Sequence, residues 1–240
     1  MKNKIILVIL FIFPIVTYLI FASAKHNSLF LPVLSENNSE IPSDWTALGN
    51  EKVHLQDKIT ILGFTGTDMK EFKANMFNLN QKIYHKYFGF EDFQMVMIAP
   101  SGTETEIEKM IVELNRITED MKGWKFVFAT PDDIVSYYDS FHFKTALDAI
   151  KGTSQVFILD KNKNLRGRKG KNKKGEEEYR ESYNASSAAD LHNEMTDDVK
   201  IILREYRLAL KKNKRKDEFR DHIVDEVEKS SQDKNNKNEE

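Results

Sequence analysis

Four short, mostly apolar runs, separated by stretches with helical periodicity, constrain the fold of this chain more than any other feature. The runs are ITIL (59–62), FQMVMIA (93–99), WKFVFA (124–129) and QVFIL (155–159). Their lengths are typical of strands that are buried on both faces of a sheet. Strands that alternate with helices favour an α/β fold, a mixed central sheet covered by helices on both faces.

Amphipathic helices are expected between and after these strands, because apolar residues recur there at spacings of three and four. Thr103 and Glu106 predict a capping box at the start of one helix, Thr130 and Pro131 predict the start of a short helix, and Ser187 predicts the start of the last one. The apolar stripes are Met69, Phe72, Met76, Leu79, Ile83 and Tyr87; Ile107, Met110, Ile111, Leu114 and Ile117; and Leu191, Met195, Val199, Ile202, Tyr206 and Leu210.

Two further segments complete the expected sheet. The stretch KVHL (52–55) predicts a short strand, and the turn residues at 160–164 predict a hairpin between the run at 155–159 and residues 165–168. Such a hairpin followed by a helix adds an antiparallel edge to the sheet. Residues 169–187 are polar and are expected to form a loop.

Residues 5–22 form an uncharged apolar run at the start of the chain. At about 1.5 Å per residue a helix of this length reaches about 27 Å, close to the thickness of the hydrocarbon core of a bilayer. The run predicts a transmembrane anchor over residues 1–24, although the sequence ASA at 22–24 also matches the end of a signal peptide. Lys2 and Lys4 place the N-terminus in the cytoplasm, so the rest of the chain is exported under both interpretations. The predicted location is the cell membrane, with a periplasmic domain.

The remaining boundaries come from composition. Residues 25–50 contain prolines, asparagines and serines without periodicity and are expected to be a linker, residues 51–210 the domain, and residues 211–240 a charged, disordered tail. The net charge of −2 over 240 residues argues against nucleic acid as a partner. The expected partners are the membrane and another membrane or periplasmic protein.

The segments KVHLQDKITILGFTGTDMKEF, FQMVMIAP and WKFVFATPDDI resemble the SCO (SenC-like) branch of the thioredoxin-like proteins, which are membrane-anchored copper chaperones for cytochrome oxidase assembly. The resemblance covers roughly residues 51–165. It implies a thioredoxin-like fold, here with an N-terminal transmembrane helix and a long C-terminal helix.

That family holds copper and exchanges thiols through a C-x-x-x-C motif after the GFT-like turn and a histidine before the late strand. The resemblance puts Thr67 and Glu71 at the two cysteine positions and Gly152 at the histidine position. Ser154 stands where other thioredoxin-like proteins carry a cis-proline. The whole chain contains no cysteine. Disulfide exchange needs a thiolate and cuprous copper prefers sulfur ligands, so the resemblance implies a degenerate site with no cofactor.

Other site chemistry finds weaker support in the sequence. Met69, Met76, Met95, Met97 and His142 could together replace the missing copper ligands, but methionines on apolar stripes are more often core residues, and no two histidines have metal-ligand spacing. Acids in a first helical turn, such as Asp68 and Glu71, complement the helix dipole without any catalytic role. No enzymatic activity and no catalytic residue are expected.

Residues 161–174 hold six lysines and two arginines and no acid. Arg166, Arg168, Lys169 and Lys171 form a candidate binding patch for anionic lipid or an acidic partner. A solvated hairpin neutralised by the glutamates at 176–178 is the simpler alternative.

The sequence thus predicts a membrane-anchored, redox-inactive, SCO-like binding module, accessory to oxidase assembly. A copper carrier with Met and His ligands and a structural envelope protein that contacts lipid remain as alternatives.

Overall fold

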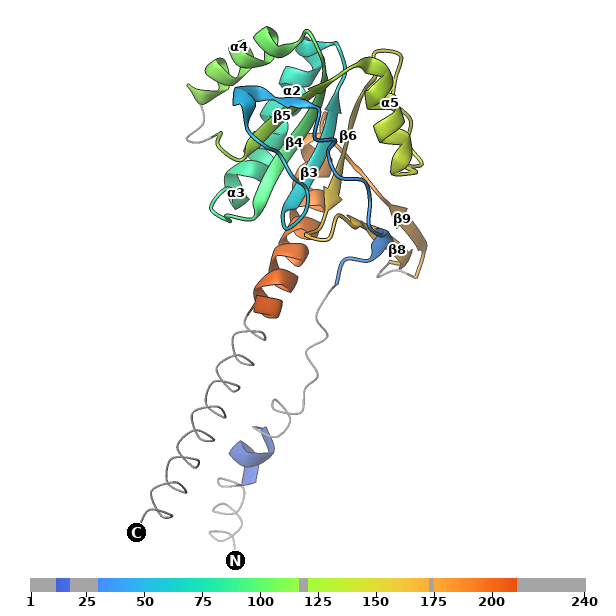
Figure 1. Ribbon diagram of the computed structural model, residues 1–240. Helices are drawn as coiled ribbons and strands as arrows, with labels where there is room; N and C mark the ends of the chain where they lie inside the picture. Colours follow the sequence, from blue (N-terminus) through green and yellow to red (C-terminus); the bar gives the residue numbers. More distant parts are fainter. Residues whose placement is uncertain (1–11, 18–29, 117–120, 173–174, 211–240) are drawn as a thin grey trace, which may run out of the picture.

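The computed structural model describes residues 12–17, 30–116, 121–172 and 175–210. Its centre is a mixed sheet with the strand order β1-β7-β6-β3-β4-β5-β2, and β10 pairs with β6 beside this path (Figure 1). The strands of this sheet are β1 (Val33–Ser35), β2 (Thr46–Ala47), β3 (Ile59–Thr65), β4 (Phe93–Pro100), β5 (Trp124–Ala129), β6 (Gly152–Leu159), β7 (Leu165–Arg166) and β10 (Tyr183–Asn184). A separate hairpin consists of β8 (Arg168–Lys171) and β9 (Glu177–Arg180).

The sheet confirms the predicted mixture of strand directions. β3, β4 and β5 are parallel, whereas β6 is antiparallel to β3 and β7 is antiparallel to β6. The β3–β6 register pairs Thr65 with Gly152 and Thr60 with Leu159. The loop that follows β3 therefore lies beside the start of β6 at one end of the sheet.

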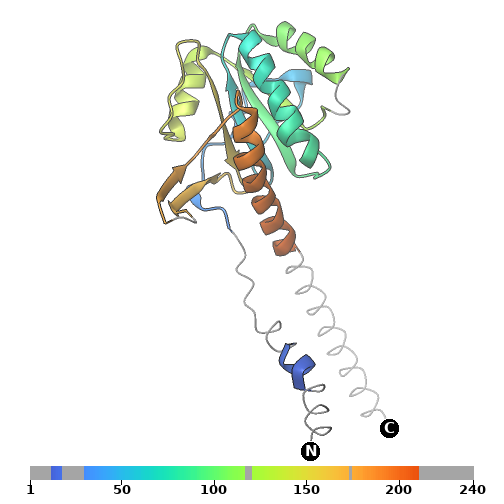
Figure 2. The ribbon, with the colours of Figure 1, turned by 180° about the vertical axis from the view of Figure 1, so that it is seen from behind.

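Helices cover both faces of the sheet (Figures 1 and 2). They are α2 (Met69–Leu79) with a π-helical turn (Asn80–Tyr84) and α3 (His85–Tyr87), α4 (Glu104–Asn115), α5 (Pro131–Ser140), and α6 (Ala188–Asp190), which runs through a second π turn (Leu191–Met195) into a helix over 196–210. A 3-10 turn (Leu48–Asn50) follows β2. The predicted helices over 69–87 and 188–210 are thus continuous helical segments, each with a π turn inside it.

Side chains alternate between two hydrophobic cores along each central strand. In β3, Ile59 and Ile61 pack with α2, α4 and the last helix, whereas Leu62 and Phe64 pack with α5. All seven residues of β3 and all eight of β4 are buried. Burial on both faces explains why these strands are apolar runs rather than alternating patterns.

All three predicted helix starts are confirmed, since Thr103, Thr130 and Ser187 are the N-cap residues of α4, α5 and α6. The Thr130 and Ser187 side chains accept hydrogen bonds from the backbone N–H groups of Asp133 and Asp190. Thr103 is the N-cap residue of α4, but its hydroxyl donates to the carbonyl of Pro100. The predicted capping box is therefore wrong.

Three segment assignments also need correction. Residues 30–50 are part of the domain and not linker, because β1 pairs with β7, β2 pairs with β5, and Leu31 is 3% exposed. Residues 52–55 form no strand. Residues 169–187 are not a plain loop, since they contain most of the β8–β9 hairpin and all of β10. Strands of two to four residues are too short to show periodicity, and they form here because a neighbouring strand supplies hydrogen bonds.

The predicted anchor and tail fall largely outside the described residues. Residues 12–17, within the apolar run, are helical. Among the residues that the structure describes, no helix is long and apolar enough to cross a bilayer. The tail prediction, 211–240, lies wholly outside the described residues.

Candidate functional site

The loop after β3 holds the residues for which the sequence predicts a degenerate site. Thr65 ends the strand, Gly66 has a φ of +63°, and Thr67 and Asp68 are exposed before α2 begins at Met69. The left-handed conformation at Gly66 suits glycine, which has no Cβ, and turns the chain sharply from strand to helix. The structure therefore retains a turn that presents residues 67 and 68 at the start of a helix.

Gly152, at the start of β6, lies directly against this loop. A Cβ atom built on Gly152 would lie 2.7 Å from both the Cα and the backbone nitrogen of Gly66, and one built on Gly66 would lie 2.9 Å from the Cα of Gly152. The Ile150 side chain would lie 3.1 Å from that second Cβ. The two backbones are in van der Waals contact, so there is no room for any side chain between them.

A ring of hydrogen bonds fixes the segment that carries Gly152. One carboxylate oxygen of Asp148 accepts hydrogen bonds from the N–H groups of Ile150 (3.0 Å) and Gly152 (2.9 Å), and the Asp148 N–H donates to the Gly152 carbonyl (2.9 Å). Ser154, two residues further on, accepts a hydrogen bond at its carbonyl from the Ala185 N–H at 2.7 Å. Hydrogen bonds to the backbone thus hold both positions, with the Asp148 carboxylate as the acceptor at Gly152.

The two acids near the turn stabilise the helix start. Asp68 is the N-cap residue of α2, and its side chain accepts hydrogen bonds from the N–H groups of Lys70 (3.0 Å) and Glu71 (3.1 Å). Glu71 is exposed in the first turn. This arrangement is the one expected of acids that complement a helix dipole.

The soft ligands of the alternative copper site do not gather at this loop. Met76, Met95 and Met97 are at most 1% exposed and belong to the core on the α2 face of the sheet. Met69 packs against the same core, and His142 is exposed at a φ of +55° after α5. In the described part of the chain, no group of three or more His, Asp or Glu side chains could hold a metal ion.

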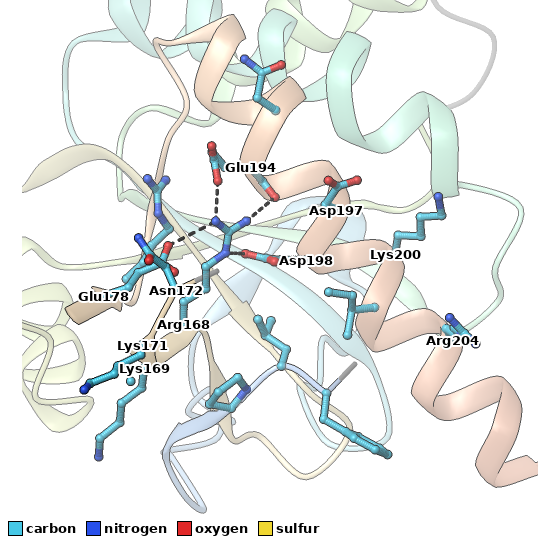
Figure 3. Close-up of a pocket in the computed structure, with 17 residues that line it drawn as sticks. Arg168, Lys169, Lys171, Asn172, Glu178, Glu194, Asp197, Asp198, Lys200 and Arg204 are labelled. Atoms are coloured by element: carbon cyan, nitrogen blue, oxygen red, sulfur yellow. Dashed lines mark hydrogen bonds and ion pairs between the residues drawn. The ribbon is translucent and has the colours of Figure 1, made fainter. Parts of the chain in front are cut away.

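A second candidate site is a groove of about 910 Å³ between the β8–β9 hairpin, residues 30–32 and the last helix (Figure 3). Arg168 crosses it from the hairpin to the helix. Its Nε donates to Asp198 at 2.8 Å, and one of its terminal nitrogens pairs with Glu194 (2.5 Å) and Glu178 (3.3 Å). The Tyr183 hydroxyl donates to the same oxygen of Asp198 at 2.5 Å.

Burial shifts the pKa values of this cluster. It raises the pKa of the Asp198 carboxyl above its ordinary value, although hydrogen bonds from Arg168 and Tyr183 oppose the shift. It also raises the pKa of the Tyr183 phenol, and the negative charge of Asp198 adds to that effect. Burial alone would lower the pKa of Arg168, but hydrogen bonds to Asp198 and Glu194 raise it overall. Arg168 therefore stays positively charged, and Glu178, Glu194 and Asp198 neutralise its charge.

Arg166 is equally committed to the fold. Its side chain donates to the Leu31 carbonyl and pairs with Asp160 at 3.1 Å and Glu205 at 2.6 Å, and the residue is 7% exposed. Of the four residues in the predicted patch, Lys169 and Lys171 are exposed, whereas the two arginines are engaged in ion pairs. Sequence reasoning anticipated the glutamates at 176–178, of which Glu178 pairs with Arg168, but missed the other acids that engage the two arginines. The signal was Asp198, a charge on the apolar stripe of the last helix.

Comparisons with known proteins agree with this geometry at the level of the fold. No protein-family model and no curated protein matches the sequence. Among solved structures, an SCO1/SenC family lipoprotein from Bacillus anthracis is 15% identical with a TM-score of 0.50, covering 73% of this chain and 99% of its own. The chain has a thioredoxin-like fold. With this fold, the loop after β3 and Gly152 occupy adjacent positions at one end of the sheet, as the resemblance implied.

Other similar structures come from the same group of proteins. BsSco, a member of the Sco family of cytochrome c oxidase assembly proteins, is 13% identical with a TM-score of 0.49, covering 72% of this thioredoxin-like chain and 98% of its own. A copper-bound ScoI from Arabidopsis thaliana is 13% identical with a TM-score of 0.44, covering 68% and 98% respectively.

Proposed function

We propose that this chain is a membrane-anchored, extracytoplasmic binding module with a thioredoxin-like fold that carries out neither thiol exchange nor copper transfer. The absence of cysteine from the whole sequence supports the first part, because thiol exchange needs a thiolate. The apolar run at residues 5–22 supports the anchor. A binding module acts through its exposed surface, and the fold provides the scaffold.

The contact between Gly66 and Gly152 is the observation that carries this proposal. If only the ligands had been replaced, a cavity would remain where the copper and its histidine lie in the resembling family. Here the two backbones touch, so a histidine at position 152 has no space for its Cβ. Position 152 therefore lacks a metal-binding side chain and also has no space for one.

The buried methionines argue against the copper-carrier alternative. A cuprous ion could reach Met76, Met95 or Met97 only by disrupting a core in which each is at most 1% exposed. The two remaining donors are His142, which follows α5, and Met69, which begins α2. They come from different elements and include no thiolate, the ligand that cuprous copper prefers.

A role beside respiratory oxidase assembly is the natural extension of the resemblance, since proteins of this group assemble cytochrome c oxidase. We infer that the partner is another membrane or extracytoplasmic protein that recognises the outer surface of the domain. The fold alone does not determine this role, because one fold serves many functions.

Site-specific cross-linking in native membranes tests the binding role. A photoreactive residue at Thr67, exposed at the end of the sheet, should give one dominant adduct with a membrane or extracytoplasmic protein. The same probe at Lys52, exposed at another position, is the control for random contacts. Oxidase subunits in the Thr67 adduct would support the assembly role. The same weak set of adducts from both positions would contradict a specific binding surface there.

A further inference from the structure

The groove beside Arg168 carries cations that the fold itself does not use. Lys169 and Lys171 lie on its hairpin side, and Lys200 and Arg204 lie on its helix side (Figure 3). All four are exposed, and none makes an ion pair with a residue that the structure describes. Ion pairs would remove their charge from an external ligand, so these four remain available to one.

The acids near the groove are mostly neutralised. Glu178, Glu194 and Asp198 pair with Arg168. Asp197 lines the groove on the helix, and Glu177 lies opposite Lys171 in the hairpin register; both carboxylates are exposed. Four free cations against two free carboxylates leave the rim of the groove positive.

The groove also lies at the end of the domain where the chain leaves for its predicted anchor. Residues 30–32 line it, and the anchor is predicted to end at residue 24. Six residues span at most about 20 Å, so the groove has to stay near the bilayer surface. Phe30 is 66% exposed at its edge, and aromatic side chains favour the interface between headgroups and acyl chains.

We propose that Lys169, Lys171, Lys200 and Arg204 form a docking surface for anionic phospholipid headgroups, which holds the domain against the bilayer with the loop after β3 facing away. The orientation follows from the β3–β6 register, which puts Thr65 and Gly152 at the end of the sheet opposite Thr60 and Leu159. The turn after Leu159 leads through β7 to Arg168, where the hairpin side of the groove begins. This inference rests on the anchored topology of the proposed function and adds a ligand class and an orientation to it.

Fluorescence quenching from the lipid surface tests this docking, and the chain is well suited to it because an introduced cysteine is its only thiol. The full-length chain carries a fluorophore at Leu208→Cys, one turn beyond Arg204, or at Thr67→Cys at the other end of the sheet. Both are exposed positions, and neither change alters the charge. Each protein is reconstituted into phosphatidylcholine vesicles or equimolar phosphatidylcholine and phosphatidylglycerol vesicles that contain a headgroup quencher.

The label at Leu208→Cys should be quenched more strongly in the anionic vesicles, and high salt should remove the difference. The label at Thr67→Cys should be unaffected by lipid charge. Each cation replaced by glutamine should lower the ratio of docked to undocked domain about fivefold, so changing all four should abolish the effect of the anionic lipid. The control removes four other cations, Lys52, Lys82, Lys109 and Lys151, and should retain it.

The outcomes separate this inference from the proposed function. Equal quenching of the Leu208→Cys label in both kinds of vesicle would overturn the docking surface. So would an equal loss of the anionic-lipid effect in the groove variant and in the control variant that removes four other cations. An unquenched label on a chain that stays in the vesicles would do the same and would favour an acidic protein as the ligand of the groove. Release of the chain from vesicles at alkaline pH would instead contradict the anchor itself.

Discussion

Two glycines decide, at the scale of single residues, what the loop after β3 can hold. Gly66 and Gly152 come from distant parts of the sequence and meet through the β3–β6 register. Adding a Cβ atom at either position forces backbone atoms closer than van der Waals contact permits. The loop therefore keeps its shape by excluding side chains, and this shape is incompatible with a ligand at position 152.

Gly152→Ala should lower the free energy of unfolding by about 1–3 kcal/mol, because its Cβ would meet the backbone of Gly66. Gly152→His should lower it further. Urea-induced unfolding followed by circular dichroism measures both. Gly89→Ala is the matched control, since Gly89 has nothing within 4 Å of its Cβ position and should change stability by less than about 0.5 kcal/mol. Equal effects at positions 89 and 152 would show that the contact is not tight.

Sequence reasoning predicted a degenerate site at these residues but could not show that the two backbones touch there. Thr67 and Gly152 follow from the resemblance, and the structure brings their segments together. The closure depends on the distance between two backbones that the sequence does not encode locally. Arg166 and Arg168 were misread for the same reason, because their acids, Glu205 and Asp198, lie on a helix far along the chain.

At the scale of elements, the β8–β9 hairpin is attached to the last helix by Arg168. Asp198, the most deeply buried of its partners, has a side chain that is only 3% exposed. A buried carboxylate that loses its cation is costly, so the attachment is stronger than a surface ion pair would be.

Arg168→Gln should lower the free energy of unfolding by about 3 kcal/mol, the low end of the range for breaking a buried pair, because Arg168 is itself partly accessible. Lys169→Gln, one residue along the same strand, should change it by less than about 0.5 kcal/mol. Denaturant titration of these two variants, of Asp198→Asn alone and of Arg168→Gln combined with Asp198→Asn provides the measurement. If the double variant is no more stable than the sum of the single changes predicts, the two side chains are not coupled.

Tyr87 links α3 to the last helix, since its hydroxyl donates to the Thr196 carbonyl at 2.8 Å. Burial, followed by the negative charge of Asp197, raises the pKa of Tyr87 from 10.0 to about 12. A raised pKa means that the stability from this phenol is complete below pH 10 and is lost as the pH rises towards 12. The thermal unfolding temperature of the wild type should therefore fall more steeply with pH than that of Tyr87→Phe over this pH range. Parallel curves for the two proteins would contradict the shift.

The long elements were predictable and the short ones were not. The stripe from Met69 to Tyr87 is long enough to show helical periodicity, and the apolar run of β4 is long enough to indicate a buried strand. β1, β2 and β10 have two or three residues each, and they exist only because β7, β5 and β6 offer free edges. This is why residues 30–50 looked like a linker.

At the scale of the whole molecule, the fold separates two surfaces. The loop after β3 lies at one end of the sheet, and the groove beside Arg168 lies towards the other end, with the segment that leads to the predicted anchor (Figure 1). In the proposed function, this domain without thiols presents one surface to a partner and another to a bilayer. Its function then depends on what those surfaces bind.

Competition for cuprous ion tests the absence of copper chemistry most directly. The full-length chain is titrated into a coloured cuprous–chelator complex under anaerobic conditions, with the Thr67→Cys, Glu71→Cys double variant as a comparison that restores two thiols. The unmodified chain should leave the complex intact at an equimolar concentration. Removal of one copper per chain, lost on changing Met69 to leucine or His142 to alanine, would contradict the proposal that this fold acts through its surfaces alone.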